Sequence, residues 1–213
     1  MTFRDRIDAG RRLATALGHL AGRDGLLVLA LPRGGVPVAA EVAHAFGAPL
    51  DLWFAHKIGA PYNPEFAIGS VTETGPPHID EQAIQSMRVP FSYVREEAAI
   101  QQADLARRAR LFRGSRPAPE IAGRTVILID DGVATGSTAH AALGALRAQG
   151  PEWLVLAAPV AAAGAVQRLV ADADELAILH APQGFAAVGE FYDRFPQVTD
   201  AEVVLLVKRS MEQ

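Results

Sequence analysis

The sequence from residue 125 to residue 138 reads TVILIDDGVATGST, and this stretch decides the fold. Residues 125–129 are β-branched or apolar, a short run typical of a strand buried within a parallel sheet. The run ends at two carboxylates, Asp130 and Asp131, and a loop of small residues, 134–138, follows. The next segment, AHAALGALRAQG, has a helix-forming composition and ends at a glycine. This order predicts an α/β domain that binds a ligand beyond the carboxyl end of the strand.

The small-residue loop indicates what that ligand is. Three hydroxyls and unobstructed backbone N–H groups at a helix N-terminus favour an anion such as phosphate. Two adjacent carboxylates would repel it unless they face sugar hydroxyls or a hydrated divalent cation. The sequence contains neither GxxxxGK[ST] nor GxGxxG in this stretch. A helix cap with two solvated carboxylates is the simpler alternative, but a cap needs one such residue rather than five. The loop residues are Ala134, Thr135, Gly136, Ser137 and Thr138.

This stretch resembles the phosphoribosyl-pyrophosphate motif of type I phosphoribosyltransferases. The motif consists of an apolar strand, two acidic residues, two variable residues and a small-Thr-Gly-small-Thr loop. The loop sequence is most similar to that of the adenine phosphoribosyltransferase version, which also has Ala-Thr-Gly. The hypoxanthine-guanine version carries an Asp at the place of Ala134, and that Asp handles a proton on the base. The resemblance therefore argues against a 6-oxopurine acceptor.

A second strand–loop–helix unit precedes the first. The strand at 26–31, LLVLAL, runs into Pro32-Arg33-Gly34-Gly35, and residues 36–46 have helical composition. Adjacent glycines permit positive φ and close backbone approach to a ligand, and the guanidinium of Arg33 matches phosphate oxygens. A tight turn with a solvated arginine is the alternative. The resemblance implies a pyrophosphate-binding loop here, with a cis peptide expected between Arg33 and Gly34. We predict that this loop shares a pocket with the loop 134–138.

Alternating strands and helices with short connections predict a mostly parallel sheet flanked by helices, a Rossmann-like three-layer arrangement. We expect one domain, 1–213, with its core at about 26–180 and a small hood at about 181–213, to which the N-terminal helix is a candidate addition. The other expected elements are packing helix 3–21, strand 50–58, a mobile Gly/Pro-rich segment 59–78 with a hairpin arm at 66–71, helix 92–113 capped by Ser92, strand 153–160, helix 161–171, strand 175–180 and helix 200–209.

Four further positions have a functional and a structural interpretation. Lys57 follows a strand and could reach pyrophosphate, or it is a surface lysine. Phe185 could stack on a flat base, because the resemblance implies a hood with an aromatic at a similar place, or it is a core residue. His56 is interpreted as structural, since the six histidines show no metal-ligand spacing. The basic end of the helix at 107–113 is interpreted as solvated and dipole-complementing.

The composition bounds the remaining possibilities. The 213 residues are 50% hydrophobic and 21% charged, with a formal charge of −4, which is ordinary for a globular protein and disfavours nucleic acid as a partner. There is no cysteine, so disulfides and thiolate metal sites are excluded. No signal-peptide pattern or membrane-length apolar run is present. We expect a cytoplasmic protein that binds neither membrane nor nucleic acid, and the sequence leaves homo-oligomerisation open.

The resemblance implies a Mg²⁺-dependent phosphoribosyltransferase of nucleotide salvage, which transfers phosphoribosyl from phosphoribosyl pyrophosphate to a nitrogenous acceptor, with a nucleobase as first candidate. Asp130 and Asp131 would bind ribose hydroxyls and stay ionised near the cationic carbon. The loop 134–138 would hold the 5′-phosphate, and Arg33, Gly34 and Gly35 the pyrophosphate. Asp131 is a candidate metal ligand, although phosphoribosyl pyrophosphate itself would hold most of the Mg²⁺. Two alternatives remain: a non-catalytic regulator of the same fold, and an enzyme for a non-base acceptor.

Overall fold

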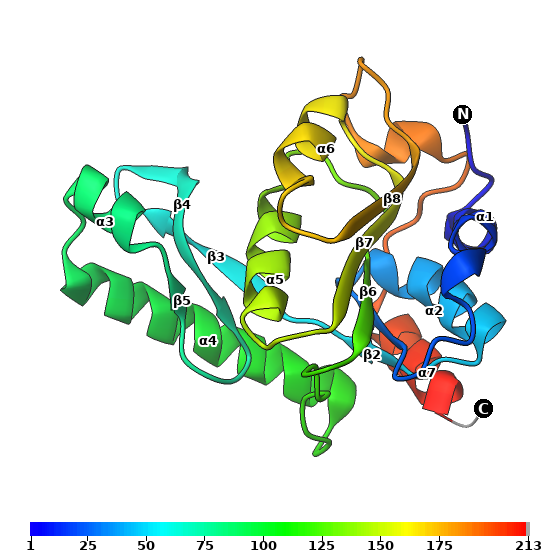
Figure 1. The fold of residues 1–213 in the computed structure, drawn as a ribbon, viewed down its shortest axis with the longest axis horizontal. Coiled ribbons are helices and arrows are strands. Elements are labelled where there is room, and N and C mark those ends of the chain that lie inside the picture. The colour runs from blue at the N-terminus through cyan, green and yellow to red at the C-terminus, as the bar shows by residue number, and fades with distance from the viewer. Residues whose placement is uncertain (212–213) are drawn as a thin grey trace.

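A computed structural model describes residues 1–211 of the chain. A five-stranded parallel sheet with the order β2-β1-β6-β7-β8 forms its centre, and a three-stranded antiparallel sheet, β3-β4-β5, lies beside it (Figure 1). The elements are α1 (Arg6–Ala16), η1 (Gly18–Leu20), β1 (Leu27–Ala30), α2 (Gly35–Phe46), β2 (Leu50–Leu52), β3 (Ala55–Ala60), β4 (Asn63–Thr72), β5 (His78–Ile79), α3 (Glu81–Met87), α4 (Phe91–Arg113), β6 (Thr125–Ile129), α5 (Ser137–Arg147), β7 (Trp153–Val160), α6 (Ala163–Leu169), β8 (Glu175–His180), η2 (Val188–Phe191) and α7 (Asp200–Met211).

The parallel sheet is covered on both faces, as the expected three-layer arrangement requires. Alternate strand residues enter different apolar clusters: Ile127 and Ile129 pack with the cluster that includes α1, α2 and α7, whereas Val126 and Leu128 pack with the cluster that includes α5 and α6. Successive side chains of a strand point to opposite faces. The continuous apolar run at 126–129 therefore serves both layers, and all four residues are fully buried. The predicted α/β fold class is confirmed.

The hood joins the two ends of the chain. Phe3 forms a β-bridge with Tyr192, and its backbone N–H donates to the carbonyl of Phe191 at 2.8 Å. Phe3, Ala9 and Tyr192 form a small apolar cluster of their own. The last helix, α7, leaves this region and packs against α2 and α4 on one face of the main sheet (Figure 1).

A lobe formed by β3, β4, β5, α3 and α4 projects from one side of the main sheet (Figure 1). The expected strand 50–58 is in fact two strands, since β2 ends at Leu52 and β3 begins at Ala55 in the other sheet. Trp53 and Phe54, which lie between the two strands, are apolar and buried, so the sequence looks like one continuous strand. Helix α4 begins at Phe91 after Pro90, so the expected Ser92 cap is wrong. Helix α3 was not expected, and α6 is shorter than the expected 161–171.

A buried ion-pair network ties the lobe to the core. Arg113, at the end of α4, donates through Nε to Asp51 of β2 at 2.9 Å and through Nη1 to Glu73 at 2.6 Å. It also donates to the carbonyl of Leu52 at 2.8 Å. The Arg113 and Glu73 side chains are 2% and 7% exposed. Removing one partner of such a pair leaves an uncompensated buried charge, so the network fixes the position of α4 relative to the sheet.

Candidate active site

Two loops meet at the carboxyl end of the main sheet. Strands β1 and β6 are adjacent and parallel, with Ala30 paired to Ile129, and Leu31 donates its N–H to the carbonyl of Ile129 at 2.8 Å. The loop 31–35 leaves β1, and the acidic pair and the loop 134–138 leave β6. The prediction that the two loops follow neighbouring strands is confirmed.

The loop 31–35 lies directly against the acidic pair. A Cβ atom on Gly35 would lie 2.5 Å from the carbonyl oxygen of Ile129, and one on Gly34 would overlap the Asp131 carboxylate. Gly34 has φ −58 and ψ −39, so close approach rather than positive φ requires glycine here. The cis peptide bond joins Pro32 to Arg33, one residue earlier than the resemblance led us to expect.

The loop 134–138 has a different construction. Gly136 adopts the left-handed conformation with φ 81, and α5 begins at Ser137 with no side-chain hydrogen bond capping it. The first N–H groups of a helix lack intrahelical acceptors, so this end suits an anion. Ala134, Thr135 and Thr138 are exposed, whereas Gly136 is buried beside Leu169 of α6. From α6, Arg168 donates to the carbonyl of Thr135 at 2.7 Å.

Asp131 is held by the hood. Arg6 of α1 donates to its Oδ2 through Nε at 2.8 Å, and Nη2 of Arg6 lies 2.8 Å from the same oxygen. Arg6 also donates to the carbonyl of Pro196 at 2.7 Å and stacks 3.7 Å from the ring centroid of Phe195. The hydroxyl of Tyr192 donates to the Asp131 carbonyl at 2.6 Å. The expected packing helix at 3–21 therefore also supplies a residue to the site.

Asp130 is in a different electrostatic state. Its Oδ1 accepts the backbone N–H of Asp131 at 2.9 Å, but burial, and after it the charge of Asp131, raise its pKa well above the usual range of an aspartate. Two neighbouring carboxylates in a desolvated site do not both ionise readily. The environment of Asp130 thus favours the neutral form more than that of an ordinary aspartate, and the expectation that both aspartates stay ionised stays a prediction.

The acidic pair faces two cavities rather than one. Asp131 lines a cavity of about 490 Å³ together with Arg6, Arg33, Gly34 and residues of the hood. Asp130 lines a second cavity of about 350 Å³ whose walls include Pro32 of the first loop and Thr138 of the second. The predicted single pocket shared by the two loops is wrong: Gly34 lines the Asp131 cavity and Thr138 lines the Asp130 cavity, whereas Gly35 and residues 134–137 line neither.

Comparisons with known proteins identify the family of the chain. Residues 4–188 match the model of the phosphoribosyl transferase domain family. The chain belongs to this family.

Individual relatives add detail. The protein TT1426 from Thermus thermophilus has a solved structure that is 46% identical, with a TM-score of 0.92 over 98% of this chain and 99% of that chain. Two Mycobacterium tuberculosis sequences, from strains CDC 1551 and H37Rv, carry the name "Putative phosphoribosyl transferase". Each is 41% identical over 208 residues, which are 98% of this chain and 47% of the relative. The chain thus spans about half the length of the curated relatives it matches.

Two candidates outside the loops, Lys57 and Phe185, also line neither cavity. Lys57 lies on β3, paired in register with Ser70, and lines neither cavity. Phe185 stacks on Phe191 with ring centroids 5.3 Å apart, and the aromatic residue that lines the Asp131 cavity is Phe195. The roles of Lys57 and Phe185 stay predictions.

Sequence reasoning missed four residues that line these cavities: Arg6, Phe195, His56 and Arg108. Arg6 contacts Asp131 across 125 positions, and no local pattern signals such a contact. His56 was interpreted as structural and Arg108 as a solvated charge. The sequence offered one indication of the role of Arg108: it is a basic residue on the helix that follows the Gly/Pro-rich segment.

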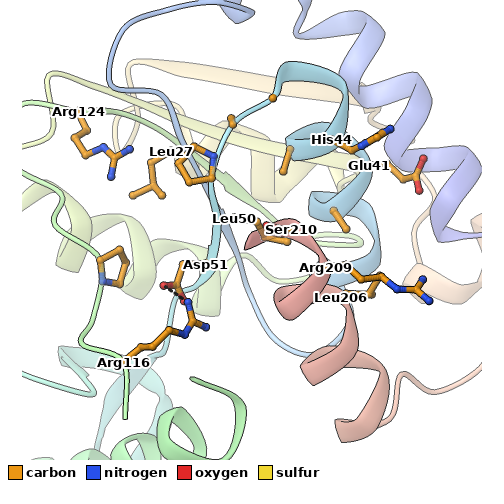
Figure 2. A pocket seen from close by; sticks show the side chains of 16 residues that line it. Leu27, Glu41, His44, Leu50, Asp51, Arg116, Arg124, Leu206, Arg209 and Ser210 are labelled. Carbon is orange, nitrogen blue, oxygen red and sulfur yellow. Dashed lines mark ion pairs between the residues drawn. The ribbon is translucent and has the colours of Figure 1, made fainter. Parts of the chain in front are cut away.

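A larger cavity, of about 610 Å³, lies elsewhere (Figure 2). It includes Leu27 and Leu50, the first residues of β1 and β2, and so lies at the amino edge of the sheet. Its Asp51 is paired with Arg113 and Arg116, and Arg124 donates to two backbone carbonyls. The C-terminal ends of α2 and α7 contribute Gly47 and Ser210, and helix C-termini disfavour anions. This cavity does not suit a sugar phosphate.

Proposed function

We propose that the protein transfers a 5-phosphoribosyl group from phosphoribosyl pyrophosphate to a nitrogenous acceptor, with a nucleobase of a salvage pathway as the first candidate. One observation carries the proposal: two loops suited to phosphate leave adjacent parallel strands and flank an acidic pair. Phosphoribosyl pyrophosphate has phosphate groups at both ends of a ribose diol, so its chemistry matches this order of sites.

The roles of the residues follow from their positions. The N-terminus of α5, with Thr135, Ser137 and Thr138, binds the 5′-phosphate. Asp130 and Asp131 contact the ribose hydroxyls. Backbone groups of Gly34 and Gly35 and the guanidinium of Arg33 bind pyrophosphate. Arg33 has one loose partner, Asp200 at 3.4 Å, in a pair whose side chains are 37% and 53% exposed, so its reorientation toward a ligand costs little.

The reaction forms one C–N bond and breaks one C–O bond at C1 of the ribose. The acceptor nitrogen attacks C1, the C1–O bond breaks, pyrophosphate leaves with the electron pair, and the N–H proton of the acceptor passes to solvent. Positive charge develops on C1 and negative charge on the leaving group. Arg6 balances the charge of Asp131, so Arg33 would stabilise the leaving group, and a bound metal would supply further positive charge there.

A divalent cation fits this site only in company with the substrate. The described residues contain no group of three or more His, Asp or Glu side chains that could hold a metal ion. Mg²⁺ is commonly bound through one or two carboxylates plus substrate phosphates, and Asp131 is the candidate carboxylate. When bound, the metal would neutralise charge on the departing pyrophosphate.

One observation favours a second function. The pairing of Asp131 with Arg6 leaves the site with little net negative charge to stabilise a cationic carbon. A non-catalytic protein that binds phosphoribosyl pyrophosphate or a nucleotide, and thereby regulates a partner, would tolerate such a pair.

A panel of nucleobases and amines, supplied with phosphoribosyl pyrophosphate and Mg²⁺ and assayed for pyrophosphate release, tests the first proposal. We expect release that depends on one class of acceptor and disappears without Mg²⁺. Calorimetric binding of phosphoribosyl pyrophosphate without turnover on any acceptor would favour the regulator. Absence of both binding and turnover would refute both functions.

A further inference from the structure

Helix α4 of the lobe carries an arginine into the second cavity of the site. Arg108 is half-buried, and its guanidinium lies 5.9 Å from the ring centroid of Phe54. Two basic neighbours on the helix are paired: Arg107 contacts Asp104 at 2.7 Å, and Arg113 contacts Asp51 and Glu73. Among residues 1–211, the structure gives Arg108 no hydrogen bond and no ion pair. A partly desolvated guanidinium with free donors favours an anionic ligand.

The cavity around Arg108 has the chemistry of a phosphate site. Pro32 of one loop and Thr138 of the other form part of its wall, and Asp130 lies between them. The apolar residues Leu31, Trp53, Phe54 and Leu105 complete the lining together with Ala55 and His56. Apolar walls strengthen charge interactions inside a cavity. No ion pair joins Arg108 to Asp130 although both line the cavity, so the guanidinium is available to a third group.

The position of Arg108 is fixed from both ends of its helix. At the C-terminal end, the Arg113 network anchors α4 to β2. At the N-terminal end, the hydroxyl of Tyr93 donates to the carbonyl of Gly59 in β3 at 3.1 Å. These contacts hold α4 in the lobe, with Arg108 lining the same cavity as Asp130, before any ligand binds. A preorganised donor loses less entropy on binding than a flexible one.

We propose that Arg108 is a substrate-binding residue through which the lobe contacts a phosphate group of the sugar phosphate lying between the two loops. The inference rests on the proposed function and adds a third anion-binding element to it, from a helix outside both loops. The guanidinium fork takes two phosphate oxygens. The contacted group is either the 5′-phosphate beside Thr138 or the pyrophosphate beside Pro32, and the experiment distinguishes the two.

Calorimetry with three ligands tests the inference: phosphoribosyl pyrophosphate, ribose 5-phosphate and inorganic pyrophosphate, each with Mg²⁺. Arg108→Gln removes the charge, and Arg107→Gln is the matched control on the same helix, because its side chain is 66% exposed and paired with Asp104. We expect Arg108→Gln to weaken binding of phosphoribosyl pyrophosphate by about 10- to 100-fold and Arg107→Gln to change it less than about twofold. Loss of ribose 5-phosphate binding assigns Arg108 to the 5′-phosphate, and loss of pyrophosphate binding assigns it to the leaving group.

Arg108→Lys is the second variant, which separates a loss of binding from a folding defect. It keeps the positive charge but loses the planar guanidinium group. We expect an intermediate loss of affinity and a melting temperature equal to that of the wild type. If folded Arg108→Gln or Arg108→Lys protein binds all three ligands as the wild type does, the inference is wrong while the proposed function stands. An equal loss in Arg107→Gln also overturns it. If the wild type itself binds none of the three ligands, the proposed function fails and the inference falls with it.

Discussion

The two loops of the candidate site both depend on glycine, but for opposite reasons. In the loop 31–35 the backbone is right-handed at Gly34, and glycine is needed because the neighbouring strand β6 and the Asp131 carboxylate leave no room for a side chain. In the loop 134–138 the backbone is left-handed at Gly136, where a Cβ would lie 3.2 Å from the Leu169 side chain. The first loop is set by tertiary packing against the acidic pair, and the second by local backbone conformation.

Because of this difference, we expect substitutions in the two loops to have different effects. A change in the first loop moves the acidic pair, since the two are in contact. A change in the second alters the N-terminus of α5 and leaves the acidic pair in place. The following substitutions test this division, beginning with the largest expected effect.

Removing both charges of the acidic pair affects the element that the loops share. Asp130→Asn with Asp131→Asn retains size and most hydrogen bonding but removes the carboxylate charges, including the one that pairs with Arg6. We expect kcat/KM to fall by about 100- to 10,000-fold, measured as pyrophosphate release with the acceptor that the panel identifies. Asp24→Asn, in an exposed turn, is the control. Turnover within tenfold of the wild type would show that the carboxylates only cap the strand.

Gly35→Ala tests the packed loop. The added methyl meets the Ile129 carbonyl at 2.5 Å and the Asp130 Cα at 3.0 Å, so β1 and β6 must separate at their carboxyl ends. We expect a loss of about 1–3 kcal/mol in the free energy of unfolding, measured by urea denaturation, together with weaker binding of phosphoribosyl pyrophosphate. Gly144→Ala in α5 is the matched control, because no atom lies within 4 Å of the added methyl. It should stabilise the protein by up to about 1 kcal/mol.

Gly136→Ala tests the loop set by backbone conformation. A left-handed residue with a side chain costs about 1–2 kcal/mol, and the methyl would also meet Leu169. We expect denaturation to show this loss, and Gly136→Asn to recover part of it because asparagine tolerates the left-handed region. Equal stability of the alanine variant and the wild type would contradict the assignment of φ 81 to this residue.

Thr138→Val has the smallest expected effect, since it removes one exposed hydroxyl and keeps the shape of the side chain. A hydrogen bond from a hydroxyl to a charged phosphate contributes about 1.5–3 kcal/mol at most, and exposure reduces it. We expect ribose 5-phosphate affinity to fall about 3- to 30-fold, with pyrophosphate affinity unchanged. A larger loss for pyrophosphate than for ribose 5-phosphate would reverse the assignment of the two loops.

The sequence predicted those parts of the molecule that are marked by a pattern within one uninterrupted stretch of residues. Strands β7 and β8 have the expected bounds, 153–160 and 175–180, because each contains a continuous run of apolar residues. Both loops were found for the same reason. Arg6 and Arg108 were missed because their significance lies in contacts with distant segments. The break between β2 and β3 was missed because Trp53 and Phe54 are buried outside either strand, and burial alone cannot mark a strand's end.

The contact between Arg6 and Asp131 has a consequence for biosynthesis. At a translation rate of about 5–20 residues per second, the 125 positions between these residues correspond to roughly 6–25 s of synthesis. The partners of α1 in the hood, Tyr192 and Pro196, are made later still. During that interval Asp131, the carboxylate that Arg6 contacts in the folded protein, has not been made. The acidic pair therefore acquires its final electrostatic environment only after most of the sheet has been made. The site is complete only when the hood residues near the end of the chain have been synthesised.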